Sequence, residues 1–237
     1  MICKLCQKNR KLCKSHVIPE FLYKAIYDDK HRANEITIEP FKKKFIQKGY
    51  YEELLCKECE EKISRLEKYC KENFFDNIPQ NIKTREYEAD NLDYNKFILF
   101  HLSILWRASI SSRKEFKNVR LDKGPHEELI RKLLENQISP SYEDYSFFGK
   151  LLVHQGKVIQ DLIYEPINTK YKAHHVYVFT FGGAQWYYLV SSHSKKEFSK
   201  ILFKEDGKLI LRVEELLENT FFKDSILKYQ KSKSAKR

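Results

Sequence analysis

The sequence LLCKECEEKISRLEKY, at residues 54–69, is the stretch that decides how the N-terminal third of the protein folds. Cys56 and Cys59 form a CxxC pair, and apolar residues recur after them at helical spacing. A second CxxC pair, Cys3 and Cys6, lies near the start of the chain. Each CxxC turn presents two sulfurs to one ion, and four thiolates suit tetrahedral Zn²⁺. The sequence therefore predicts a structural zinc site with the ligands Cys3, Cys6, Cys56 and Cys59.

Two further cysteines, Cys13 and Cys70, fall outside these pairs. Cys70 lies on the apolar stripe of the predicted helix, which is typical of a buried structural thiol. Cys13 lies close to His16, but a second metal site there would need two more ligands nearby in the sequence. Redox chemistry at a CxxC pair is the alternative to zinc, yet a thioredoxin-like site needs a βαβ pattern that is absent from this sequence.

The composition is that of a basic protein with a substantial core. Aromatic residues make up 14% of the 237 residues, which supplies enough large apolar surface to exclude general disorder. Lys and Arg number 44 against 33 Asp and Glu, and the formal net charge is +11. Such an excess favours polyanionic partners, either nucleic acid or an anionic membrane surface, and the second is disfavoured because no basic amphipathic helix stands out. A protein from a lysine-rich proteome would show the same balance, so that interpretation stays open.

The N-terminus and the apolar runs argue against secretion and against a membrane span. Residue 3 is already a cysteine, and no apolar signal-peptide region follows it. The most apolar run, FILFHLSILW at residues 97–106, is too short to cross a bilayer and contains His101. We therefore expect a cytoplasmic protein without a membrane partner, in a reducing compartment where cysteines serve metals or catalysis instead of disulfides.

Composition and periodicity divide the chain into four parts. Residues 1–75 hold all six cysteines, and residues 76–92 are polar and contain Pro79, as expected of a linker. Residues 93–230 have the pattern of a helical plus antiparallel-β domain, and residues 231–237 form a basic tail. The predicted fold class is α+β.

Within this plan the hydrophobic pattern predicts individual elements. Helical spacing marks the helices, and alternating apolar residues around turn residues mark the hairpins. The expected helices span residues 19–27, 59–74, 94–111, 125–137, 194–203 and 213–222. The expected hairpins span residues 32–51, 151–164 and 176–190, the last of them turning at Gly182-Gly183.

Between the two CxxC pairs lies the sequence SHVIPEF at residues 15–21. The order CxxC, then His16 with Pro19, then CxxC and a helix resembles the HNH-type (ββα-metal) nucleases, over residues 1–75 only. The same residues look like those of a bacterial group of degenerate HNH-like zinc proteins. The resemblance implies a zinc-stapled HNH-like N-terminal module joined to the helical and antiparallel-β region.

This resemblance also implies a function, that of a metal-dependent DNA endonuclease in a setting such as bacterial anti-phage defence. His16 would be the general base that activates water, a role suited to an imidazole with a pKa of about 6.5. Glu60 would help to hold a catalytic Mg²⁺ or Mn²⁺, although it also suits the first turn of a helix. Ser15, Tyr51 and Glu60 stand where family members usually have Asp, Asn, and Asn or His.

A basic and aromatic segment inside the zinc-bounded region is the candidate nucleic-acid surface. Lysines next to Phe and Tyr suit a phosphate backbone and unstacked bases. A lysine-rich solvated hairpin is an alternative of equal weight. The alternative function is a catalytically inactive zinc module that binds nucleic acid, with DNA favoured, or a protein partner. The candidate contact residues are Lys42, Lys43, Lys44 and Lys48.

Overall fold

The structure is a computed structural model, and it describes residues 1–38, 41–172, 174–191 and 193–223. Only the backbone is described for residues 36–38 and 41–43. The basic tail predicted at residues 231–237 therefore lies outside the described residues.

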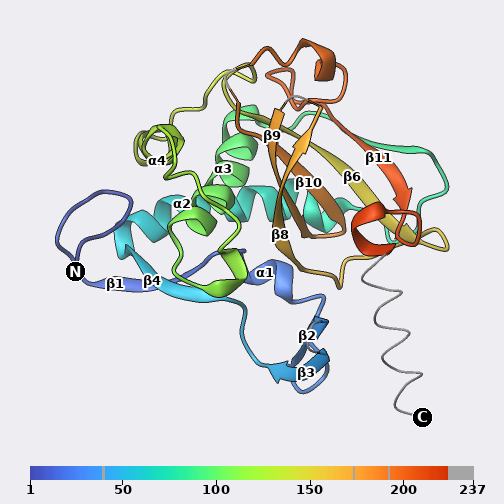
Figure 1. The fold of residues 1–237 in the computed structure, drawn as a ribbon, viewed down its shortest axis with the longest axis horizontal. Helices are drawn as coiled ribbons and strands as arrows, with labels where there is room; N and C mark the ends of the chain where they lie inside the picture. Colours follow the sequence, from blue (N-terminus) through green and yellow to red (C-terminus); the bar gives the residue numbers. More distant parts are fainter. Residues whose placement is uncertain (39–40, 173, 192, 224–237) are drawn as a thin grey trace.

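A nearly fully buried helix, α3 (Tyr94–Ile110), lies at the centre of the fold (Figure 1). It begins where the Asp93 carboxylate, as N-cap, accepts a hydrogen bond from the Lys96 backbone NH at 3.1 Å. All side chains from residue 97 to residue 109 are buried, as expected of a core helix that is apolar on most faces. The helix predicted over residues 94–111 is thus confirmed. Within the described part of the chain, no helix has the length and apolar character needed to cross a membrane.

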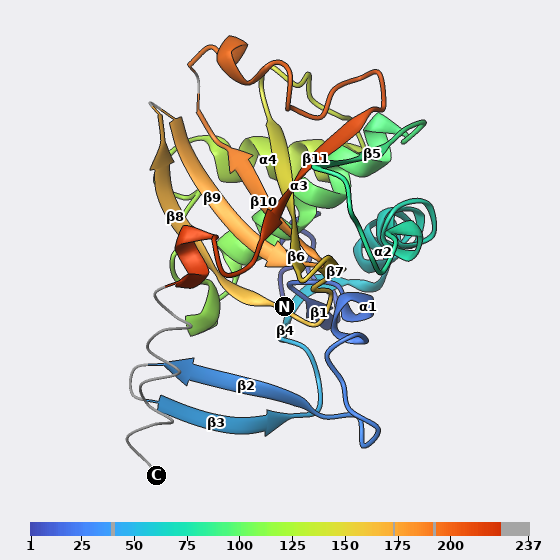
Figure 2. The same cartoon turned by 90° about the vertical axis from the view of Figure 1, so that its right-hand side faces the viewer.

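A mixed sheet packs on α3 (Figure 2). Its strands are β5 (Glu86–Ala89), β6 (Ser146–His154), β7 (Lys157–Val158), β8 (Tyr164–Tyr171), β9 (His174–Phe181), β10 (Ala184–Leu189) and β11 (Leu209–Glu215). Their order is β5-β11-β6-β10-β9-β8, with the short β7 paired to β6. Aromatic contacts join sheet and helix, since the His101 ring lies 4.0 Å from the Phe147 ring and 4.6 Å from the Trp186 ring, centroid to centroid.

The N-terminal third contains two antiparallel strands followed directly by a helix. β1 (Leu12–His16) pairs with β4 (Tyr51–Cys56). α2 (Lys57–Asn73) begins at the next residue and packs beside α3. The apolar positions that predict a helix over residues 59–74 all face the core, and that prediction is confirmed. These buried positions are Cys59, Ile63, Leu66 and Cys70.

The chain between β1 and β4 forms α1 (Glu20–Tyr23) and then a two-stranded ribbon. The ribbon consists of β2 (Ala33–Ile38) and β3 (Phe41–Ile46), and Figure 2 shows it standing apart from the rest of the fold. Its register places Lys44 opposite Glu35. The hairpin predicted within residues 32–51 is confirmed.

One hydrophobic core joins the N-terminal third to the sheet. The buried cluster runs from Cys3 through α2 and α3 to Leu211 of β11. Residues 76–92, which composition marks as a linker, contain the end of the 3-10 turn η1 (Phe75–Asn77) and the edge strand β5. Because β5 pairs with β11, this segment is part of the sheet.

Two predictions for the C-terminal region are confirmed in detail. The helix expected over residues 125–137 is α4 (His126–Asn136). The hairpin expected around Gly182-Gly183 is β9–β10, and both glycines have positive φ values, 61° and 83°. Only glycine suits the first position, because a Cβ there would lie 2.5 Å from a ring carbon of Phe75.

Two other elements differ from expectation. Residues 194–203 contain a 3-10 turn, η3 (Lys196–Phe198), instead of a helix. The prediction of a helix starting at residue 213 is also wrong, because residues 213–215 belong to β11. This strand lies between β5, which pairs with residues 209–212, and β6, which pairs with residues 211–215 and so satisfies the backbone there. Its pairing with β6 is parallel, whereas the expectation was of an antiparallel region throughout.

The complete burial of His101 predicts an acid-sensitive fold. Its Nδ1 lies 2.8 Å from the Tyr188 hydroxyl, and burial lowers the pKa of the imidazole well below its usual range. Below about pH 6.5 the unfolded chain binds a proton at this residue and the folded protein does not. This residue alone should then lower the free energy of unfolding by about 1.4 kcal/mol per pH unit.

Urea unfolding near pH 7 and near pH 5 measures this effect. The His101→Phe variant keeps an aromatic ring beside Phe147 and removes the titrating group. Between these two pH values, we expect the free energy of unfolding of the variant to fall less steeply than that of the wild type, by about 1.4 kcal/mol per pH unit. An identical pH dependence in the two proteins would show that His101 does not contribute.

Candidate metal centre and the histidine next to it

The four predicted zinc ligands meet at one point. The Sγ atoms of Cys3, Cys6, Cys56 and Cys59 all lie within 4.8 Å of one another. The Cys6 and Cys56 sulfurs are 3.9 Å apart, close to the spacing of about 3.8 Å between ligands in a tetrahedral site with Zn–S bonds of about 2.3 Å. All six cysteines of the chain are free thiols. The prediction of a four-cysteine group able to hold zinc is confirmed.

Backbone hydrogen bonds shape the first pair of ligands. The Cys3 NH donates to the Lys8 carbonyl at 3.0 Å and the Gln7 NH donates to the Cys3 carbonyl at 2.9 Å, which closes the turn. Gln7 adopts a left-handed backbone, with φ of 57°. The Lys4 NH donates to the Leu54 carbonyl at 3.0 Å and so attaches this turn to β4.

The second pair lies where β4 becomes α2. Cys56 is the N-cap of α2, which places Cys59 in the first helical turn. The Cys56 NH donates to the Cys3 sulfur at 3.3 Å, so the two pairs are already in contact through the backbone. Burial raises the pKa of the Cys3 thiol, but backbone NH groups, chiefly those of Cys6 and Cys56, outweigh it and lower the pKa to about 7. Such hydrogen bonds stabilise the thiolate that a metal ion requires.

The other two cysteines lie outside this cluster. Cys70 is buried in α2, and burial raises the pKa of its thiol well above the usual range, as expected of a structural thiol. Cys13 lies in β1, and no second group of potential metal ligands is present among the described residues.

His16 ends β1 and pairs with Tyr51 of β4. Its side chain is 27% exposed, and its Nε2 lies 3.0 Å from an oxygen of the Glu20 carboxylate. The two atoms are close but not aligned for a hydrogen bond, and both are buried without another hydrogen-bond partner in the described structure. The other oxygen of Glu20 accepts a hydrogen bond from the Tyr27 hydroxyl at 2.9 Å. The sequence analysis missed Glu20, and its position at the start of α1, four residues after His16, was the available signal.

Burial keeps the His16 imidazole neutral. It lowers the pKa of the ring, Glu20 and Glu67 oppose this effect, and Arg107 and Lys48 add to it, with a net lowering from the usual value. The ring is therefore uncharged at neutral pH and able to accept a proton. Because Lys48 acts on His16, the structure brings this predicted nucleic-acid-binding residue near the candidate base.

Glu60 lies in the first turn of α2 and is held by Ser15. The Ser15 hydroxyl donates to the Glu60 carboxylate and accepts a hydrogen bond from the Leu55 NH at 3.1 Å. Burial raises the pKa of Glu60, although the Ser15 hydrogen bond and Arg107 oppose it. Ser15, the residue before the candidate base His16, thus holds the candidate metal ligand Glu60 in place.

Arg107 of α3 reaches this site from the C-terminal region. Its side chain is only 1% exposed, and it donates to the His16 carbonyl at 2.6 Å and to the Glu67 carboxylate at 2.8 Å. A guanidinium in this position fixes β1 and α2 against α3 and places a permanent positive charge near His16. Nothing in the sequence around residue 107 marks this role.

The predicted lysine surface lies on β3 and in the loop after it. Lys44 is exposed and pairs with Glu35 at 2.9 Å, and Lys48 is also exposed. Lys42 and Lys43 belong to β3, but their side chains lie outside the described part of the structure. The β2–β3 ribbon therefore presents at least Lys44 on its surface.

Comparison of the chain with protein-family models, with curated proteins and with solved structures finds no match in any of the three. These comparisons therefore assign no family and no activity to this chain. What the site can do follows from its own contacts, chiefly the four-thiol cluster and the His16–Glu20 pair.

Proposed function

We propose that this protein is a metal-dependent DNA endonuclease whose general base is His16 in a zinc-stapled HNH-like module. The observation that carries the proposal is the pairing of His16 Nε2 with the Glu20 carboxylate at 3.0 Å, at the end of β1. A neutral imidazole next to a carboxylate is a common arrangement for removing a proton from water. The order of β1, β4 and α2 supports the resemblance to the ββα-metal nucleases.

The residues divide the chemistry between them. The other ring nitrogen of His16, Nδ1, accepts the proton of the attacking water, while Nε2 lies 3.0 Å from the Glu20 carboxylate, which then stabilises the imidazolium ion. Glu20, whose buried Oε2 has no hydrogen-bond partner among the described residues, would be the first ligand of a divalent cation, while the Glu60 carboxylate accepts a hydrogen bond from Ser15. When bound, Mg²⁺ or Mn²⁺ would stabilise the negative charge on the phosphate.

A specific observation favours a second candidate, a zinc module that binds nucleic acid without cleaving it. The Arg107 guanidinium is buried against the His16 carbonyl and the Glu67 carboxylate. This fixed positive charge would repel a divalent cation placed close to it. The net charge of +11 suits nucleic acid as the partner in either case.

Cleavage assays with site variants separate the two candidates. Zinc-loaded wild type should cut plasmid DNA in Mg²⁺ or Mn²⁺, and His16→Ala should lower the rate by about a hundredfold or more with an unchanged fold. His193→Ala, at an exposed histidine outside the site, is the matched control and should cut normally. If the wild type cuts neither plasmid DNA nor single-stranded RNA, or if His16→Ala cuts equally well, the protein is a binding module.

The cleavage rate should also depend on pH in a defined way. Because burial lowers the pKa of His16, the base is active at neutral pH and is lost only as the pH falls below about 6.5. Glu20 raises the pKa of His16, so Glu20→Gln should move this acidic limb to still lower pH. Profiles of rate against pH for the wild type and for Glu20→Gln measure the shift, and coincident limbs would rule out the coupling.

Nucleic-acid binding should weaken steeply with salt, because each neutralised phosphate releases counterions. Replacing Lys42, Lys43 and Lys44 together by Ala should reduce the slope of log affinity against log salt by about 0.9 for each phosphate that is no longer neutralised. Fluorescence anisotropy with a labelled DNA duplex measures both slopes. An affinity that stays constant from low to physiological salt would remove nucleic acid as an electrostatic partner.

A further inference from the structure

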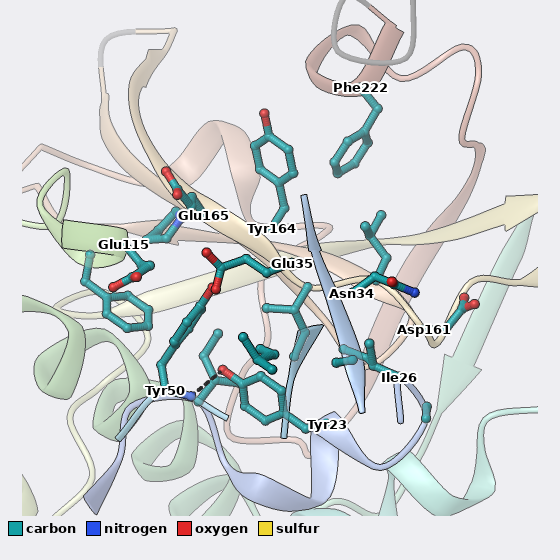
Figure 3. A pocket seen from close by; sticks show the side chains of 18 of the residues that line it. Tyr23, Ile26, Asn34, Glu35, Tyr50, Glu115, Asp161, Tyr164, Glu165 and Phe222 are labelled. Carbon is teal, nitrogen blue, oxygen red and sulfur yellow. Dashed lines mark hydrogen bonds between the residues drawn. The ribbon is translucent and has the colours of Figure 1, made fainter. Parts of the chain in front are cut away.

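A cavity of about 570 Å³ lies between the β2–β3 ribbon and the segment that leads into β8 (Figure 3). Asn34 and Glu35 of β2 line one side, and residues 161–166 line the other. Its volume is within the range of small-molecule sites, about 300–1,000 Å³. Neither His16 nor Glu20 is among its described lining residues, so the cavity is separate from the proposed catalytic site.

The charges that line this cavity are all of one sign. Among the described lining residues, the charged side chains are Glu35, Glu115, Asp161 and Glu165, and none is basic. This all-acidic lining is unusual in a chain whose formal net charge is +11. Figure 3 shows Glu35, Glu115 and Glu165 together at one end of the cavity, above Tyr50, and Asp161 at the other end.

The acidic end is only partly neutralised by the protein itself. Glu115 is 5% exposed and pairs with Arg113 at 3.2 Å, while Glu35 pairs with Lys44 and accepts a hydrogen bond from the Tyr50 hydroxyl at 2.9 Å. Burial and the negative charges of Glu115 and Glu35 raise the pKa of Glu165, and the nearby Lys117 and Lys114 offset this only in part. A positive group placed among the three carboxylates would relieve that repulsion.

Apolar side chains cover the remaining walls. Ile26 and Ile163 line the cavity, and the Tyr164 and Phe222 rings meet edge to face with centroids 5.3 Å apart. These surfaces suit an aliphatic chain, which would gain from leaving water. A compact metal ion fits less well, because it would leave these apolar walls without a contact.

We infer that this cavity binds a small organic cation, whose alkylammonium group lies among Glu35, Glu115 and Glu165 while its aliphatic chain lies along Ile163 and Phe222. Nucleic acid is excluded, because the acidic wall repels phosphate. The inference goes beyond the proposed nuclease function and holds whether or not His16 is catalytic. Two sources carry this chemistry: a free amine, and the lysine side chains of residues 224–237, which follow Phe222 closely in the chain.

Calorimetric titration of the full-length protein at low salt tests the inference. The probe is diaminooctane, with an ammonium group at each end of its chain, and octanediol is the matched uncharged probe. We expect saturable binding of the diamine alone. Glu165→Gln should weaken that binding by about fivefold, while Glu86→Gln, at an exposed glutamate on β5, should leave it unchanged.

A second full-length variant distinguishes the two sources. It replaces Lys228, Lys231, Lys233, Lys236 and Arg237 by Gln. Diamine binding to the wild type identifies a free amine as the ligand, and binding only after this replacement identifies the chain's own lysines. The inference is overturned if neither protein binds the diamine, if octanediol binds as tightly, or if Glu165→Gln behaves like Glu86→Gln.

Discussion

Cys56→Ser should abolish stoichiometric zinc binding and unfold the N-terminal third. The purified wild type is expected to carry about one Zn²⁺ per chain, since four thiols meet within 4.8 Å. Apparent binding energies of structural zinc sites are about 10–16 kcal/mol, and that energy is also folding energy. Losing one thiolate ligand would remove a large part of this binding free energy. The Cys56 sulfur also lies 3.9 Å from the Cys6 sulfur, so the change removes a ligand at the point where the two pairs meet, while the backbone NH that donates to Cys3 is kept.

Metal analysis and thermal unfolding measure this effect together. Because one core runs from Cys3 to Leu211, we expect the midpoint of unfolding of the whole protein to fall. Cys13→Ser is the matched control, because Cys13 lies in β1 outside the cluster and should keep both zinc and stability. Wild-type protein without zinc, or a Cys56→Ser variant as stable as the control, would contradict the assignment.

Arg107→Met is expected to lower the free energy of unfolding by roughly 3 kcal/mol. Among the substitutions considered, only the loss of a zinc ligand should have a larger effect on stability. The substitution removes the two hydrogen bonds that Arg107 makes to the N-terminal third, one to the His16 carbonyl and one to Glu67. Glu67, which is 22% exposed, would then retain a charge without its partner. Arg107→Lys should recover only part of the loss, because an ammonium group cannot reproduce the planar fork of donors.

Chemical denaturation of the three proteins tests this prediction. Arg65→Met, at an exposed arginine on α2, is the matched control and should change stability by less than about 0.5 kcal/mol. If Arg107→Met is as stable as Arg65→Met, the buried pair contributes nothing net.

The parts of the fold that the sequence predicts correctly depend on short-range patterns. The CxxC spacing identifies the ligands because each turn fixes two sulfurs locally, whatever surrounds it. The helices over residues 59–74 and 94–111 follow from the spacing of apolar residues, and the turn at Gly182-Gly183 follows from the conformational freedom of glycine. In each case the physical cause lies within a few residues of the pattern.

The helix predicted from residue 213 shows where such patterns fail. Val213–Glu218 have helical spacing, but their first three residues extend β11. β11 is held by backbone hydrogen bonds to β5 on one side and to β6 on the other. For residues 213–215 the pairing with β6, together with the hydrogen bond from the Val213 NH to the Arg85 carbonyl at 2.8 Å, outweighs a local preference that is worth less than about 1 kcal/mol per residue.

The sequence by itself therefore determined the four cysteines that could hold zinc, the core helix α3 and the basic character of the chain. Only the tertiary structure decided what surrounds His16 and what lines the acidic cavity. Arg107 is separated from His16 by 91 positions and from Glu67 by 40, and no local period connects them. Such contacts arise because burying one shared core brings α2, α3 and the ends of β1 and β4 to a common place. Long-range packing, and not any motif, sets the charge around the candidate base.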